Sequence, residues 1–274
     1  MLVINRSSEM QAECRRLRQN GTMGYVPTMG CLHEGHLSLV RRARQENDAV
    51  AVSIYVNPTQ FSAGEDLSSY PRELERDLRL CEKEGVDILF YPDDAEMYPE
   101  GFCTHTTVSG LDRIMCGKSR PTHFQGVCTV VCKLFNIVQP DSAYFGQKDY
   151  QQAVIIKRMA KDLNMGIKIM VCPVVRETDG LAMSSRNSYL SGEERAKAPE
   201  IYAALREARD SILNKGSVAG AINRIEKRVN RVGRLDYAVA ADPETLMHKE
   251  QRPLVLAVAA YVGSTRLIDN ILIE

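Results

Sequence analysis

The segment MGYVPTMGCLHEGHLSLVRRARQENDAVAVSIYV, residues 23–56, decides the fold of this chain. Short runs rich in apolar and β-branched residues at 23–26 and 49–56 flank an amphipathic stretch at 36–47. A strand, a helix and a second strand in this order form a βαβ unit, whose strands lie parallel. The segment therefore predicts an α/β fold.

The same alternation continues as far as residue 171. The pattern predicts helices at 70–84, 126–138 and 149–163, and strands at 86–91, 143–145 and 167–171. We therefore expect a Rossmann-like, doubly wound parallel sheet with helices on both faces. Sheets of this kind bind ligands at the carboxyl ends of their strands.

The pattern changes after Ser191, where S-G-E-E forms a capping box for a long helix to about residue 214. A second helix at 217–232 follows, and then three strands at 235–240, 254–262 and 265–272 without helices between them. Consecutive strands favour an antiparallel sheet. We expect a larger domain at 1–175 and a smaller α+β domain at 176–274, with a ligand site in the cleft between them.

Charge and composition exclude several classes of protein. Lys plus Arg and Asp plus Glu both total 35, so the chain has no bulk attraction for nucleic acid or anionic membranes. No apolar run approaches the roughly 18 residues of a membrane-spanning helix, and the first residues lack the apolar core of a signal peptide. We expect a cytoplasmic protein with neither nucleic acid nor membrane as a partner.

The eight cysteines include no C-x-x-C pair. In a cytoplasmic chain of this size, buried reduced thiols are a better interpretation than disulfides or a metal site. Cys128 and Cys132 lie one helical turn apart in an apolar stretch and are expected in the core.

The first chemical motif is PTMGCLHEGHLSL, residues 27–39, which leaves the first strand of the βαβ unit and enters a helix near His36. His33 and His36 are three residues apart. At a helix start this spacing puts both imidazoles on one side, near free backbone N–H groups and the positive end of the helix dipole. A phosphate fits such a place. By spacing alone, a helix-capping pair or a weak metal site is an equally good interpretation.

Polar side chains also follow two later strands. In VSIYVNPTQF, residues 52–61, Asn57 and Gln60 lie at the expected sheet edge, where their amides suit a polyol-acid ligand, although a plain Asn-Pro turn remains the commoner alternative. In SAYFGQKDYQQ, residues 142–152, Lys148 can reach phosphate oxygens. Asp149 can cap the following helix or bind hydrated Mg²⁺.

The last motif is VVRETDGLAMSSRNSYLS, residues 174–191, at the expected domain junction. It places the hydroxyls of Ser184 and Ser185 beside Arg186. A solvated Ser-rich linker is the alternative to a functional loop.

These motifs carry a family resemblance. T-M-G-x-L-H-x-G-H after a first strand resembles the ATP-binding signature of the nucleotidyltransferase and class I aminoacyl-tRNA synthetase superfamily, and the loop at 174–191 resembles its KMSKS loop. With RPTHFQGV at 120–127, the segments follow the order and spacing of the pantothenate synthetase family over essentially the whole chain. Cys31, Tyr55 and Thr122 depart from the commoner pattern, and Thr122 stands where Gly is usual.

The resemblance implies an enzyme that condenses D-pantoate with β-alanine, using ATP and Mg²⁺ but no organic prosthetic group, through a pantoyl adenylate. It also implies a homodimer. Catalytic residues around the phosphates would be His33, His36, Lys148, Ser184, Ser185 and Arg186. ATP would also contact Met29, Gly146, Met183 and Asp149, the last through Mg²⁺. The pantoate and β-alanine site would comprise Pro27, Met29, Asn57, Gln60 and Gln152.

Two other functions share part of this pattern. A nucleotidyltransferase acting on a phosphorylated substrate would have the same T-x-x-H-x-G-H, but not the NPTQF and GLAMSSRN segments. A nucleotide-binding regulator or zinc module without catalysis would not need both Lys148 and Arg186.

Overall fold

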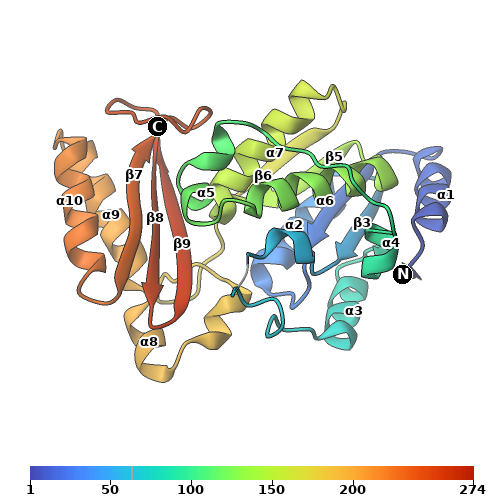
Figure 1. Ribbon diagram of the computed structural model, residues 1–274, viewed down its shortest axis with the longest axis horizontal. Coiled ribbons are helices and arrows are strands. Elements are labelled where there is room, and N and C mark those ends of the chain that lie inside the picture. Colours follow the sequence, from blue (N-terminus) through green and yellow to red (C-terminus); the bar gives the residue numbers. More distant parts are fainter. Residues whose placement is uncertain (63) are drawn as a thin grey trace. The chain divides into compact units, whose positions relative to one another are not determined.

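The computed structural model describes residues 1–62 and 64–274, which divide into two compact units (Figure 1). The first unit comprises Met1–Gly146 and Ile155–Cys172, and the second comprises Gln147–Val154 and Pro173–Glu274. The segment that follows the fifth strand of the first unit therefore packs with the second unit.

The first unit is built on a six-stranded sheet in the order β1-β4-β3-β2-β5-β6. All of its pairings are parallel. Its strands are β1 (Leu2–Ile4), β2 (Met23–Thr28), β3 (Ala49–Ile54), β4 (Ile88–Phe90), β5 (Ser142–Gly146) and β6 (Lys168–Cys172). The order reverses at β2, which pairs with β3 on one side and β5 on the other, and this confirms the doubly wound fold.

Helices cover both faces of this sheet. They are α1 (Ser7–Arg18), α2 (Glu34–Glu46), α3 (Leu74–Lys83), α6 (His123–Val138) and α7 (Tyr150–Asp162). Because α1 contacts α6 and α2 contacts α3, right-handed crossovers place these two pairs on opposite faces. Every residue of β3 is buried, as a strand covered on both faces requires. The short α4 (Asp94–Met97) and α5 (Cys116–Ser119) lie in the connections.

Two details of the first unit differ from the sequence-based expectation. The helix expected at 70–84 begins only at Leu74, with Glu73 as its N-cap, and Pro71 before it disfavours a helical conformation at Tyr70. The edge strand β1 and helix α1 were not predicted. β1 has only three residues, of which Leu2 and Val3 are about half exposed, so it shows no strand periodicity.

The second unit contains an antiparallel sheet in the order β7-β8-β9, as predicted. Its strands are β7 (Arg234–Ala241), β8 (Leu254–Val262) and β9 (Thr265–Ile273), and its main helices are α9 (Glu200–Leu213) and α10 (Val218–Val229). These helices pack on the sheet and bury Leu205 and Ile225 against Leu256 and Val258.

The long helix expected at 191–214 is two helices, α8 (Gly192–Lys197) and α9, and that expectation was wrong. Pro199 stands between them as the N-cap of α9, and proline is tolerated at a helix start but not inside a helix. The predicted capping box is confirmed, since Ser191 and Glu194 each accept the other's backbone N–H.

None of the eight cysteines, all of which lie within the described residues, forms a disulfide. Cys14, Cys81, Cys116, Cys128 and Cys172 are buried as expected. Cys31 and Cys132 are half-buried and Cys103 is exposed, so the expectation of buried thiols is wrong for these three.

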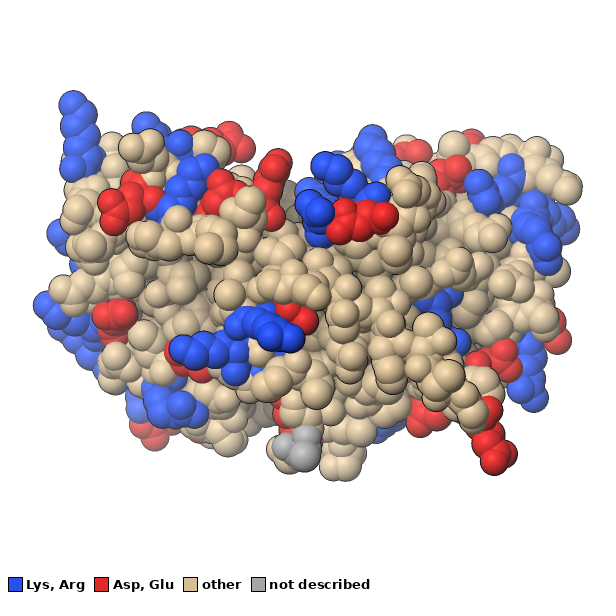
Figure 2. Space-filling model, turned by 45° about the horizontal axis from the view of Figure 1, so that its top comes forward, with Lys and Arg blue, Asp and Glu red and all other residues tan. Residues whose placement is uncertain are grey.

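The surface carries no broad patch of one sign on the face drawn in Figure 2, where basic and acidic side chains are interspersed. Within residues 1–62 and 64–274, no helix combines the length and the hydrophobicity needed to cross a membrane.

Candidate active site

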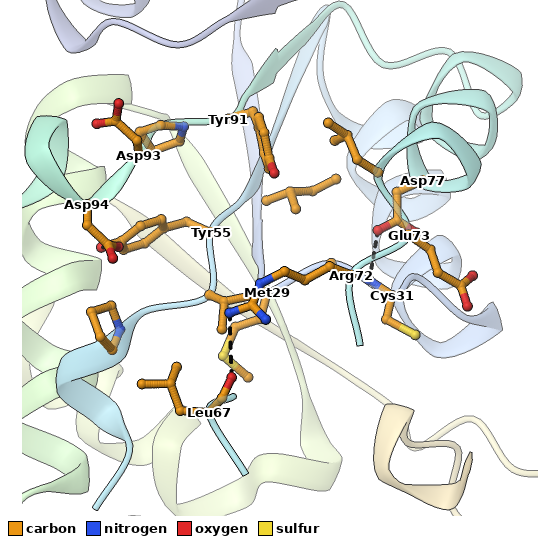
Figure 3. Close-up of a pocket in the computed structure, with 16 residues that line it drawn as sticks. Met29, Cys31, Tyr55, Leu67, Arg72, Glu73, Asp77, Tyr91, Asp93 and Asp94 are labelled. Carbon is orange, nitrogen blue, oxygen red and sulfur yellow. Dashed lines mark hydrogen bonds between the residues drawn. The ribbon is translucent and has the colours of Figure 1, made fainter. Parts of the chain in front are cut away.

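The loop after β2 is fixed by backbone hydrogen bonds to a buried carboxylate from α3. Gly30 and Cys31 both have positive φ, at 82° and 49°, so the chain turns sharply before it reaches the histidines. The carboxylate of Asp77, only 1% exposed, accepts a hydrogen bond from the backbone N–H of Cys31 at 2.7 Å (Figure 3). It also accepts one from the backbone N–H of Leu32 at 2.8 Å. A Cβ on Gly30 would lie 2.9 Å from Ile54, so glycine is required there for space as well as conformation.

Sequence reasoning missed Asp77. Burial raises the pKa of its carboxyl, and the two backbone N–H bonds oppose that rise by favouring the charged form. The sequence did carry a signal for a buried carboxylate here. Asp77 stands on the apolar face of α3, three residues after Leu74 and four before Cys81. A charged residue at a buried helical position needs a specific partner.

The two histidines stand together at the start of α2, as predicted. His33 is the N-cap and His36 is the third helical residue, with ring centroids 4.1 Å apart. The Nδ1 of His33 accepts from the Gly35 N–H at 3.1 Å, and the Nδ1 of His36 accepts from the His33 N–H at 3.4 Å. A neutral imidazole that accepts at Nδ1 carries its proton on Nε2. Acceptance at Nδ1 therefore assigns the proton of each neutral ring to Nε2.

Capping and anion binding are compatible in this arrangement. The capping alternative is real, since both rings complete a reciprocal capping box. The box engages Nδ1 of each ring, and both rings stand beside the positive end of the α2 dipole, where an anion is favoured. Among the described residues, no group of three His, Cys, Asp or Glu side chains is arranged to hold a metal ion.

A pocket of about 320 Å³ lies at the carboxyl ends of β2, β3 and β4, where doubly wound sheets bind ligands (Figure 3). Its wall includes Met29 from the predicted substrate residues. Aromatic side chains of Tyr55 and Tyr91 and the cation of Arg72 line it as well, and Tyr55 donates to Asp94 at 2.8 Å. The pocket thus combines apolar walls with both signs of charge.

The predicted amide pair is buried next to Met29. Asn57 and Gln60 are 1% and 9% exposed, and the Asn57 amide donates to the Gln60 side-chain oxygen at 3.3 Å. The Gln60 amide in turn lies 2.8 Å from the Met29 sulfur. Three of the predicted substrate residues are therefore brought together, and they lie on the 3₁₀ helix η1 (Pro58–Gln60), the residue before it and the loop after β2.

The start of α6 fixes the backbone that carries Gln60. A Cβ at Gly126 would lie 2.3 Å from the carbonyl oxygen of Thr59, so only glycine lets α6 approach this closely. His123 Nδ1 is 2.8 Å from the Gln60 carbonyl oxygen, and Arg120 donates to the same oxygen at 3.4 Å. These residues of the RPTHFQG segment hold Gln60 in place.

Arg120 also forms a two-bond ion pair with Glu65, with both N···O distances at 2.6 Å. Burial opposes ionisation of Glu65, but the hydrogen bonds and charge of Arg120 hold its pKa below the ordinary value. The pair ties the segment after η1 to the start of α6.

In the second unit, Lys148 and Asp149 lie on the 3₁₀ helix η3 (Gln147–Asp149), directly before α7. The Lys148 ammonium is 3.5 Å from the Asp149 carboxylate, a long ion pair, and the two side chains are 20% and 47% exposed. Gln152 follows in the first turn of α7 and is half-buried.

The predicted serine loop is an ordered hairpin-like turn. Arg176 and Ala182 form an isolated antiparallel bridge, and Met183 donates its N–H to Val175 at 3.0 Å. Ser184 then caps η4 (Ser185–Tyr189), its hydroxyl accepting the Arg186 N–H at 3.3 Å. Internal bonding of this kind argues against a solvated linker.

The predicted site residues divide between the two units. Pro27, Met29, His33, His36, Asn57, Gln60 and Gly146 belong to the first, and Lys148, Asp149, Gln152, Met183, Ser184, Ser185 and Arg186 to the second. Within the first unit, the histidines and the amide pair flank one loop, which Asp77 supports.

Replacing Asp77 by asparagine is expected to lower the free energy of unfolding by about 1–3 kcal/mol, because one buried backbone N–H would face an amide NH₂ in place of an acceptor. Urea unfolding would measure it. Glu75→Gln, an exposed change of the same kind on α3, serves as the matched control and should stay within about 0.5 kcal/mol of the parent chain. Equal stability of both variants would contradict the support assigned to Asp77.

Comparison with known proteins shows similarity over the whole chain. The family model described as pantoate-beta-alanine ligase matches residues 2–272. The pantothenate synthetase of Caldicellulosiruptor saccharolyticus is 50% identical over 283 aligned positions that cover all of both chains. The crystal structure of pantothenate synthetase from Thermus thermophilus superposes with a TM-score of 0.95 at 47% identity and covers 99% of each chain.

A third relative has been solved with ligands. The pantoate-beta-alanine ligase of Francisella tularensis, in complex with beta-gamma ATP and beta-alanine, has a TM-score of 0.84 and 37% identity, covering 99% of this chain and 97% of that one.

Proposed function

The chain belongs to the pantoate-beta-alanine ligase family, and we propose here how its residues carry out the reaction of that family. The activity is an ATP-dependent ligation that joins pantoate to β-alanine. One observation supports the ATP site most directly: two imidazoles stand together at the start of α2, with ring centroids 4.1 Å apart, beside the positive end of its dipole.

We propose that the Nε2–H groups of His33 and His36 donate to triphosphate oxygens. The dipole of α2 adds positive potential at the same place. Cations and hydroxyls from the second unit, namely Lys148, Ser184, Ser185 and Arg186, would bind the same triphosphate. Met29, Gly146 and Met183 would contact the rest of the nucleotide.

The reaction proceeds in two steps. A pantoate carboxylate oxygen attacks the α-phosphorus of ATP, and the bond to the bridging oxygen breaks so that pyrophosphate leaves. The amine of β-alanine then attacks the acyl carbon of the mixed anhydride, expels AMP and loses a proton. No nucleophile of the chain takes part. The residues position two anions against each other and stabilise the charge that grows on the leaving oxygens.

Pantoate would be held by the buried amides and the residues around them. We propose that Gln60, fixed through its backbone by α6, presents the polar contact, while Met29 and Pro27 supply apolar ones. The buried side chain of Asn57 is bonded on both its amide and its oxygen, so it would act by holding Gln60 in place. Gln152 of the second unit would complete the set for pantoate and β-alanine.

Mg²⁺ fits the donor set at Asp149. The carboxylate is a hard oxygen ligand, it is about half exposed, and the described residues hold no dedicated cage for a metal ion. Mg²⁺ is typically bound by one or two carboxylates together with phosphate oxygens and water. We propose that Asp149 holds the ion that accompanies ATP and offsets the triphosphate charge.

The expected result that tests this route is exchange of labelled pyrophosphate into ATP when Mg²⁺, ATP and D-pantoate are present without β-alanine. Adenylation is complete and reversible before the amine arrives, so pantoate alone suffices. Adding β-alanine should then give AMP and pantothenate in equal amounts.

Two outcomes would contradict the proposal. Formation of ADP would indicate an acyl-phosphate route. Exchange driven by a phosphorylated substrate, with pantoate inert, would favour the nucleotidyltransferase alternative. A homodimer in the cytoplasm remains a prediction from the sequence.

A further inference from the structure

Strand β9 carries two adjacent polar side chains in the core of the second unit. Asp269 and Asn270 are 4% and 2% exposed, although most of their neighbours on the strand are apolar. Buried polar groups require hydrogen-bond partners, and those of this pair lie on the two segments that carry the proposed phosphate ligands.

Asn270 holds the turn that carries Lys148. Its amide donates to the carbonyl oxygens of Gln147 at 2.9 Å and Lys148 at 3.0 Å, and its side-chain oxygen accepts from the Gln147 amide at 3.2 Å. Both amide hydrogens are therefore used on consecutive carbonyls of η3. Aspartate has the same size but no donor, and serine has a single one, so asparagine is the short side chain that can make both bonds.

Asp269 holds the base of the serine loop. Its two oxygens accept from Arg176 at 2.6 and 2.9 Å, a bidentate pair with fixed geometry. Arg176 also donates to the Gly180 carbonyl at 3.1 Å, and its guanidinium lies 3.5 Å from the ring centre of Tyr202. The turn that leads to Ser184–Arg186 is thus fixed at its first residue.

The two anchors are linked to each other. The backbone N–H of Asn270 donates to the Asp269 carboxylate at 2.8 Å, and both residues belong to a strand paired along its whole length with β8. β9 contacts both η3 and η4. Consecutive positions of one rigid strand therefore fix the two segments relative to each other.

We propose that Asp269 and Asn270 are positioning residues of the ligase, which set the spacing between Lys148 and the Ser184–Arg186 loop for pyrophosphate departure. This inference rests on the proposed phosphate roles of those residues. It predicts a defect confined to adenylate formation, because the triphosphate is gone when β-alanine attacks.

The test compares the two half-reactions in Asn270→Ala. We expect pantoate-dependent ATP–pyrophosphate exchange at saturating substrates to fall about tenfold, since displacing a positioned group by about 1 Å can cost up to about a hundredfold. The KM for pantoate should stay within about twofold, and so should the rate at which β-alanine consumes preformed pantoyl adenylate. Equal losses in both half-reactions, or unchanged exchange in folded protein, would overturn the proposal.

A matched control separates positioning from general destabilisation. Ile225→Ala removes fully buried apolar atoms from α10 in the same unit, and at a similar loss of thermal stability it should leave the exchange rate near that of the parent chain. If Ile225→Ala slows exchange as much as Asn270→Ala does, the role of Asn270 is structural only. Should Asn270→Ala fail to fold, Gln147→Ala replaces it in the test, because it removes only the hydrogen bond that orients the Asn270 amide. Gln147→Ala should lower pantoate-dependent exchange about threefold, while the KM for pantoate and the β-alanine half-reaction stay within about twofold of the parent chain.

A double variant distinguishes failure of this inference from failure of the proposed function. If Asn270 acts through Lys148, adding Asn270→Ala to Lys148→Ala should lower exchange by less than about twofold further. Normal exchange in Lys148→Ala alone would refute the proposed phosphate site, and the positioning proposal with it. A defect in Lys148→Ala that Asn270→Ala does not share would refute the positioning proposal alone.

Discussion

Lys148→Ala is expected to lower pantoate-dependent ATP–pyrophosphate exchange by about a hundred- to a thousandfold while the protein stays folded. The loss of one preorganised charge-stabilising group typically costs this much. The side chain is one-fifth exposed and its ion pair with Asp149 is long at 3.5 Å, so little folding energy depends on that pair. Exchange kinetics and thermal unfolding of the same preparation would measure both effects.

Two controls accompany this variant. Lys157→Ala removes the same charge from an exposed position of α7 and should exchange at the parent rate. Preformed pantoyl adenylate with β-alanine should largely restore turnover of Lys148→Ala, because that step has no triphosphate. Near-normal exchange in Lys148→Ala would remove Lys148 from the phosphate site.

His36→Ala is expected to lower exchange by about a hundredfold or more, because it removes one of the two Nε2–H donors at the start of α2. The same substitution also removes the acceptor for the His33 N–H, so it weakens the capping box. Capping and phosphate binding must therefore be separated before the loss is assigned to either.

His36→Glu makes this separation. Glutamate at the third helical position is a natural capping-box residue, so it should recover about 0.5–1 kcal/mol of stability relative to alanine. Exchange should stay as low as in His36→Ala, because a carboxylate has no N–H donor and repels phosphate. His248→Ala, at an exposed histidine, is the control and should be unchanged. Exchange near the parent rate in His36→Glu would show that His36 only caps the helix.

Some helix and strand bounds differ from the sequence-based expectations, either because a proline was overlooked or because the element depends on pairing with a distant strand. Pro199 stands at the start of α9, and Pro71 lies in the segment before α3. Both helix boundaries were missed by apolar periodicity, and both prolines could have been recognised from the sequence. β1 could not, because three residues with two exposed side chains carry no pattern. It is a strand because Leu2, Val3 and Ile4 pair with β4, whose register the sequence does not reveal.

In the candidate site, too, the features set by neighbouring residues were predictable and those set by distant residues were not. His33 and His36 were predictable because a three-residue spacing at a helix start fixes their mutual geometry, whatever the rest of the chain does. The buried amides of Asn57 and Gln60 were predicted as a pair, but their anchorage on Gly126 and His123 depends on packing between segments more than sixty residues apart.

Apart from β1, α1 and the break between α8 and α9, the sequence by itself determined which elements form the parallel and antiparallel sheets and their helices, and the motifs at the strand ends, because periodicity and short spacing are properties of neighbouring residues. Only the tertiary structure decided which buried polar groups support those motifs. Asp77 meets Cys31 across 46 residues and Asn270 meets Lys148 across 122. A buried carboxylate or amide must find donors or acceptors wherever packing brings them, and periodicity carries no information about which distant backbone will be there.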